Sequence, residues 1–170
     1  MKKLLYLVRH ATAEEGGNTP MFRDFDRILT SHGIIEAARM GKFLAEKKTD
    51  IELLISSEAD RCKSTAKIFA EQLHKDADEI ILDEGIYGGG ARAYLAAVNN
   101  LDKKVKSVAI FGHNPDITFF AEYLTRADIG GAIEKAAVVA IEFEGVNWDE
   151  ISNKSGKFLF YWSPSTIARV

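Results

Sequence analysis

The chain has 170 residues and a net charge of −3 at pH 7, with 46% hydrophobic and 28% charged residues. These proportions are typical of a soluble globular protein, and the length predicts a single domain over residues 1–170. A mild acidic balance argues against nucleic-acid binding, because proteins that bind phosphate backbones usually carry a basic surface. The single cysteine, Cys62, excludes an intrachain disulfide and a zinc site built on several cysteines.

No stretch of the chain is apolar for long enough to cross a membrane, so membrane insertion is not expected. The apolar run Leu4–Val8 follows a charged start, but it is too short for the core of a secretory signal. Together with the single cysteine, this favours a cytoplasmic protein.

Short apolar runs alternate with segments of helical periodicity along the chain. The predicted strands are, in order, Leu4–Val8, Ile51–Ile55, Ile80–Leu82, Ser107–Phe111, Ala136–Phe143 and Lys157–Trp162. The predicted helices are Thr30–Glu46, Asp60–His74, Ala91–Leu101 and Pro115–Leu124, and the predicted loops are Ala11–Asp26 and Gly85–Gly90.

The alternation of strands with helices predicts an α/β fold, a three-layer α/β/α sandwich around a mostly parallel central sheet. The last two strands are joined by a polar turn, which favours an antiparallel edge. In the first helix, the apolar face is predicted to consist of Ile34, Ile35, Ala38, Phe43 and Leu44.

Polar side chains follow the predicted parallel strands at the ends where such folds bind their ligands. They are Arg9 and His10 after the first strand, Arg61 after the second, Asp83 and Glu84 after the third, and His113 after the fourth. Guanidinium pairs suit a phosphate dianion, histidine is a competent nucleophile toward phosphorus, and a carboxylic acid can protonate a leaving oxygen. The pattern predicts phosphoryl chemistry, although each residue alone could equally be a polar cap where the chain leaves the core.

Other phosphate-handling motifs are missing from the sequence. There is no phosphate-binding loop of the Gly-x-x-x-x-Gly-Lys-Ser/Thr type and no dinucleotide fingerprint. A cysteine phosphatase needs an arginine six positions after its nucleophile, and that position after Cys62 is Ile68. Asp24 and Asp26 do not directly follow a buried strand, as paired aspartates of the haloacid dehalogenase class would. Because no metal-ligand cluster occurs either, neither a metal nor another cofactor is expected.

Several segments resemble the histidine phosphatase superfamily, the phosphoglycerate mutase-like proteins. Leu7-Val8-Arg9-His10-Ala11 resembles the Arg-His-Gly signature of that family. Three later segments are also similar to family motifs, in family order: Leu29-Thr30-x-x-Gly33, Ser57-x-x-x-Arg61-x-x-x-Thr65-Ala66 and Gly112-His113-Asn114-Pro115. The short chain and the Arg-His-Ala variant look most like the SixA-type phosphohistidine phosphatases.

The resemblance implies a phosphoglycerate mutase-like fold and a metal-independent phosphatase. His10 would be the nucleophile and would be phosphorylated transiently, while Arg9, Arg61 and His113 would hold the phosphoryl oxygens. Arg27 matches an arginine of the SixA-like pattern, which implies an extra phosphate or substrate contact. From the residues alone, a loop salt bridge from Arg27 to Asp24 or Asp26 is an equally good interpretation.

The implied substrate is a phosphorylated protein that carries phosphohistidine. One alternative is a phosphomonoesterase for small phosphoesters or phosphoserine and phosphothreonine, in which Glu84 or Asp83 would be the general acid. Glu84 lies in a segment similar to the general-acid segment of the mutases, but it could equally cap the glycine loop. A further alternative, from another class, is a non-catalytic adaptor that binds phosphate without turnover.

Overall fold

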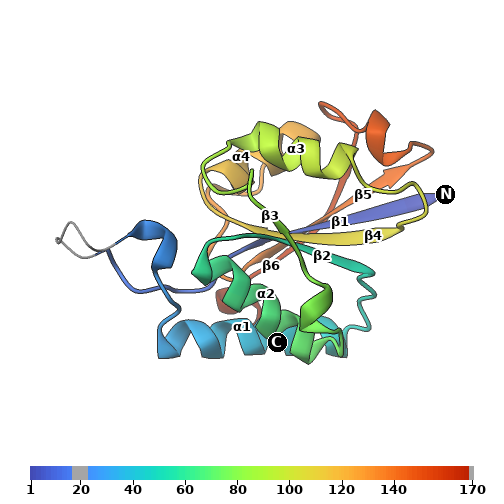
Figure 1. Cartoon of the computed structure of the whole chain (residues 1–170). Coiled ribbons are helices and arrows are strands. Elements are labelled where there is room, and N and C mark those ends of the chain that lie inside the picture. Colours follow the sequence, from blue (N-terminus) through green and yellow to red (C-terminus); the bar gives the residue numbers. More distant parts are fainter. Residues whose placement is uncertain (17–22, 169–170) are drawn as a thin grey trace.

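The structure, a computed structural model, describes residues 1–16 and 23–168. The middle of the predicted loop Ala11–Asp26, including Pro20, and Arg169 and Val170 lie outside the described residues. A six-stranded sheet runs through the centre of the molecule (Figure 1). Its strands are β1 (Lys2–Arg9), β2 (Leu53–Ser57), β3 (Ile81–Asp83), β4 (Ser107–Gly112), β5 (Val138–Glu144) and β6 (Lys157–Trp162).

The strand order in the sheet is β3-β2-β4-β1-β5-β6. The first four strands in this order are parallel to one another, whereas β5 pairs with β1 and β6 pairs with β5 in the antiparallel sense. The predicted sheet, mostly parallel with an antiparallel edge, is therefore confirmed.

Helices cover both faces of the sheet and complete the predicted three layers (Figure 1). Helices α1 (Ser31–Glu46) and α2 (Asp60–Gln72) pack on one face, and α3 (Ala91–Asn99) and α4 (Asp116–Leu124) pack on the other. The short elements are α5 (Pro164–Ile167) and the 3-10 turns η1 (Asp24–Asp26), η2 (Ala77–Glu79) and η3 (Trp148–Glu150). No helix in the described ranges is long and apolar enough to cross a membrane.

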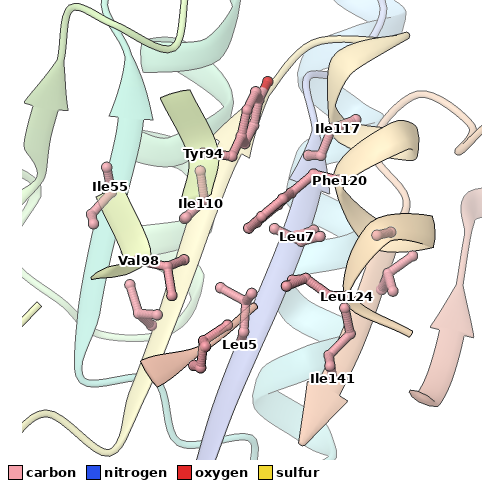
Figure 2. Packing of buried hydrophobic residues seen from close by; sticks show 14 of the residues in the cluster. Leu5, Leu7, Ile55, Tyr94, Val98, Ile110, Ile117, Phe120, Leu124 and Ile141 are labelled. Atoms are coloured by element: carbon pink, nitrogen blue, oxygen red, sulfur yellow. The ribbon is translucent and has the colours of Figure 1, made fainter. Parts of the chain in front are cut away.

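Alternation along β1 divides the core into two clusters, one on each face of the sheet. Leu5 and Leu7 point to the side of α3 and α4, where they pack with Phe120 (Figure 2). Tyr6 and Val8 belong to the cluster under α1 and α2. Because successive strand side chains face opposite ways, a strand covered on both faces carries a continuous apolar run, here Leu4–Val8. Burial of each such leucine or phenylalanine contributes about 1.5–3 kcal/mol.

Helix α1 begins where the sequence predicted, but it turns a different face to the core. Thr30 caps the helix, because its Oγ1 accepts a hydrogen bond of 3.0 Å from the Gly33 amide. Gly33 then packs directly on the backbone of Thr12, where a Cβ atom would lie 1.9 Å from the carbonyl oxygen.

The predicted apolar face of α1 is wrong for its first turns. Ile34 and Ile35 are 49% and 58% exposed, respectively. Of the predicted face, Leu44 is buried as expected, and the other buried residues are Gly33, Ala37, Met40 and Gly41. The small residues on this face let the helix approach the loop after β1, and the helical period of 3.6 residues then turns both isoleucines outward.

Gly33→Ala should lower the free energy of unfolding by about 1–3 kcal/mol, because the added Cβ atom overlaps the Thr12 carbonyl. Urea denaturation followed by circular dichroism measures the difference. The matched control is Ser31→Ala, since Ser31 is exposed in the same helical turn, and it should change stability by less than about 0.5 kcal/mol. Equal stability of the two variants would contradict the close packing of α1.

Candidate active site

Two histidines lie side by side because the parallel neighbours β1 and β4 end together. Arg9 at the end of β1 is in register with Gly112 at the end of β4, and the His10 amide donates a hydrogen bond of 3.1 Å to the Gly112 carbonyl. The next residue of each strand end is a histidine, and the rings of His10 and His113 have centroids 5.6 Å apart. Both histidines are buried.

The His10 ring has a defined tautomer. Its Nδ1 lies 2.7 Å from the backbone carbonyl oxygen of Ala11. A carbonyl oxygen can only accept, so Nδ1 carries the proton and Nε2 keeps a free lone pair. Burial, together with the positive groups nearby, lowers the pKa of His10 to about 3. The imidazole is therefore neutral at physiological pH, as a nucleophile must be.

His113 is held by contacts at its ring nitrogen Nε2 and at its backbone amide. Its Nε2 lies 2.9 Å from Ser57 Oγ, at the end of β2, and 3.4 Å from Cys62 Sγ. Its backbone amide donates to the hydroxyl of Tyr94, in α3, at 2.9 Å. Burial and then the charge of Arg61 lower the pKa of His113 to about 4, so this ring is also neutral.

The two arginines each tie one end of the guanidinium to a backbone carbonyl. Arg9 Nη1 donates to Ile133 O at 2.9 Å, and Arg61 Nη1 donates to Asp24 O at 2.7 Å. In the described part of the chain, Nε of each arginine is buried and has no hydrogen-bond partner. The Nε–Nη2 edge of a guanidinium is one that grips a tetrahedral oxyanion with two parallel hydrogen bonds.

These side chains meet in a cleft of about 660 Å³ at the carboxyl ends of the parallel strands. Its lining consists of Arg9, His10, Thr12, Ala13, Glu14, Glu15, Asp24, Arg27, Thr30, Arg61, His113, Asn114 and Lys135. The structure thus brings together all the site residues that the sequence predicted, with the exception of the acid. Glu84 is exposed in the turn after β3, and it is not among the lining residues. Asp83 instead accepts a hydrogen bond from the Gly85 amide.

Arg27 forms the loop salt bridge to Asp24, whereas its contact with a phosphate or substrate stays a prediction. Its side chain lines the cleft, and its Nη1 pairs with Asp24 Oδ1 at 3.0 Å. Asp24 also pairs with Arg61 at 3.0 Å and accepts a hydrogen bond from the Tyr87 hydroxyl at 2.7 Å. Partial burial raises the pKa of Asp24, but the three donors outweigh it and hold the pKa well below its usual range.

Sequence reasoning did not place Asp24, Tyr87 or Lys135 in the site. Asp24 and Tyr87 come from loops, where no periodicity indicates the direction of a side chain. Lys135 could have been found, because it precedes an antiparallel strand. The start of β5 lies at the same sheet edge as the ends of the parallel strands.

The arrangement suits an anion that carries an electrophilic centre. A neutral imidazole with a free lone pair lies among guanidinium groups that can neutralise developing charge. Since the rings and guanidiniums are fixed by backbone carbonyls and hydroxyls, little reorganisation is needed when a tetrahedral ligand binds.

In sequence, the family model of the histidine phosphatase superfamily (branch 1) matches residues 5–87. This range contains Arg9, His10, Arg27 and Arg61. No protein of curated function matches the chain significantly in sequence.

Solved structures share the fold at low sequence identity. One, assigned to the phosphohistidine phosphatase SixA of Agrobacterium tumefaciens, is 23% identical with a TM-score of 0.78, covering 95% of this chain and 98% of that chain. A protein histidine phosphatase SixA complexed with tungstate is 19% identical with a TM-score of 0.76, covering 96% and 99%. A mycobacterial glucosyl-3-phosphoglycerate phosphatase is 14% identical with a TM-score of 0.64, covering 93% and 97%. The predicted phosphoglycerate mutase-like fold is thereby confirmed.

The buried histidines should make the folded chain less stable at acidic pH. Their pKa values fall from 6.5 to about 3 and about 4 on folding, so below about pH 6.5 the unfolded chain binds more protons. Stability should therefore drop between pH 7 and pH 5, by about 1–2 kcal/mol for each histidine. Urea denaturation of the wild type and of His10→Gln and His113→Gln measures this. A pH dependence identical in all three would contradict the neutral state of the rings.

Proposed function

We propose that this chain, a phosphatase that belongs to the histidine phosphatase superfamily, removes phosphoryl groups from phosphohistidine on other proteins, with His10 as nucleophile. One observation carries the proposal. The free Nε2 lone pair of neutral His10 lies in a cleft with Arg9 and Arg61, whose Nε atoms have no protein partner in the described residues. A phosphoryl group bound in the cleft would accept hydrogen bonds from these Nε atoms and place its phosphorus next to His10 Nε2.

The reaction proceeds in two displacements. His10 Nε2 forms a bond to phosphorus as the bond from phosphorus to the leaving group breaks. Arg9 and Arg61 neutralise the charge on the phosphoryl oxygens, and His113 completes the ring of polar groups around them. Water then attacks phosphorus in the phosphorylated His10, which releases inorganic phosphate and restores the neutral imidazole.

The two candidate substrates differ in whether the leaving group needs a proton, and this difference favours phosphohistidine over an alkyl phosphoester. A protonated phosphoimidazole departs as neutral imidazole, whereas an alkoxide needs a proton from a general acid. Glu84 is exposed and outside the lining of the cleft. Asp24 does line the cleft, but its hydrogen bonds from Arg27, Arg61 and Tyr87 hold it as a carboxylate. Neither side chain is arranged to donate a proton to a leaving oxygen.

The rim of the cleft supports a protein substrate. Glu14, Glu15 and Lys135 line it with exposed side chains, so a phosphorylated side chain on another protein can reach the histidines from outside. The rim carries both signs of charge, which suits the mixed surface of a partner protein better than a small, uniformly anionic ligand.

A phosphohistidine-bearing protein should be hydrolysed at least about tenfold faster than an alkyl phosphate such as glycerol phosphate, because only the latter needs an acid. Glu84→Gln should change the phosphohistidine rate by less than about twofold, since the side chain lies outside the cleft lining. Release of inorganic phosphate measures both rates. Fast alkyl phosphate turnover that is lost in Glu84→Gln would instead indicate a phosphomonoesterase with Glu84 as its acid.

His10→Ala should lower turnover of p-nitrophenyl phosphate by about a thousandfold or more while phosphate still binds. Arg9→Ala should lower kcat by about 10²–10³ and weaken phosphate binding as well. EDTA should leave the wild-type rate unchanged. His74→Asn, which alters a histidine outside the cleft lining, is the matched control. Wild-type protein that binds phosphate without turnover would favour the adaptor alternative.

A further inference from the structure

Asp24 connects three segments of the chain around the cleft. Its Oδ2 accepts hydrogen bonds from Arg61 Nη2, in the first turn of α2, at 3.0 Å and from the Tyr87 hydroxyl, after β3, at 2.7 Å. Its Oδ1 accepts from Arg27 Nη1 at 3.0 Å, and its backbone carbonyl accepts from Arg61 Nη1 at 2.7 Å. The residue therefore holds both terminal nitrogens of Arg61.

We propose that Asp24 is a positioning residue for phosphoryl transfer: it grips the Nη1–Nη2 edge of Arg61 and so aims the Nε–Nη2 edge of that guanidinium at the phosphoryl group. The inference rests on the proposed function, because it assigns Arg61 to the phosphoryl oxygens. Each terminal nitrogen of a guanidinium carries two hydrogens, so Nη2 can bond Asp24 with one and a phosphoryl oxygen with the other.

Arg61 depends on this residue for its orientation. Within the described ranges, all of its side-chain hydrogen bonds go to Asp24, and the ring of Tyr87 lies 6.0 Å from its guanidinium carbon. An arginine side chain is long and flexible, so without a partner it would populate several rotamers and lose the alignment of its donors. Two bonds to one residue fix both the position and the plane of the guanidinium.

Tyr87 fixes the carboxylate in turn. Its hydroxyl donates to the same Oδ2 that binds Arg61, and its ring packs edge-on against His113 with centroids 5.5 Å apart. Arg27 holds the other carboxylate oxygen. Because three donors from different segments converge on it, the carboxylate has one favoured orientation. Its hydrogen bonds then fix the orientation of the Arg61 guanidinium.

A positioning role and a simple charge effect predict opposite results. Asp24 adds a negative charge to an anion-binding cleft, so a pure charge effect would make Asp24→Asn bind phosphate more tightly. If Asp24 positions Arg61, the same substitution should weaken phosphate binding, because asparagine is uncharged and keeps a single acceptor oxygen.

The test compares Asp24→Asn with Asp26→Asn, a matched control in the same turn whose carboxylate pairs with Arg23 instead. For p-nitrophenyl phosphate, Asp24→Asn should lower kcat by about tenfold or more, since small misplacements of a catalytic group are costly. Calorimetric titration should give weaker binding of inorganic phosphate and of vanadate. The thermal unfolding midpoint should stay near that of Asp26→Asn. Unchanged kcat, or equal or tighter phosphate binding, would overturn the inference.

A double-mutant cycle tests whether Asp24 acts through Arg61. Lysine has no guanidinium that could bind Asp24 with one edge and the phosphoryl group with another. In an Arg61→Lys background, Asp24→Asn should therefore lower kcat by less than about twofold relative to Arg61→Lys alone. An equal loss in both backgrounds would overturn the positioning role.

The calorimetric titration needs no turnover, so it separates the two proposals. Wild type that binds phosphate but hydrolyses neither phosphohistidine nor p-nitrophenyl phosphate would overturn the proposed function. In that case, weaker phosphate binding by Asp24→Asn would still support the positioning of Arg61, and equal or tighter binding would refute it.

Discussion

The parallel pairing of β1 with β4 is the constraint on which the rest of the site depends. Because the two strands end in register, the residues that follow them, His10 and His113, emerge next to each other at one edge of the sheet. The strands themselves are covered by helices on both faces, so they cannot slip without exposing apolar side chains. The packed core therefore fixes the backbone positions from which the rings of His10 and His113 project.

Groups that would repel one another as cations are packed together at this edge. The conflict is relieved because burial keeps both imidazoles neutral, while the guanidiniums remain charged and are tied to backbone carbonyls. The same desolvation that suppresses protonation of His10 leaves its lone pair free. The neutral state of His10 therefore follows mainly from the burial of its ring, and the hydrogen bond to Ala11 leaves the lone pair on Nε2.

The periphery of the cleft is built differently from its centre. Asp24, Arg27 and Tyr87 lie in turns and loops outside the sheet and its long helices, and their mutual hydrogen bonds are made between exposed or half-buried side chains. Gly33 contributes by letting α1 pack on the loop after β1, which places Thr12 and Thr30 in the wall of the cleft. The centre thus holds the two imidazoles at the strand ends, and the periphery supplies the hydrogen bonds of Asp24 to Arg61.

The sequence alone sufficed to predict the layered α/β fold and the meeting of Arg9, His10, Arg61 and His113 at one edge of the sheet. Buried parallel strands read as continuous apolar runs, and the residues directly after them must reach a common edge. Tertiary structure alone decided that Ile34 and Ile35 face outward, that Glu84 stays outside the cleft lining, and that Asp24 enters it. Such choices depend on close contacts between segments distant in sequence, and local periodicity carries no information about those contacts.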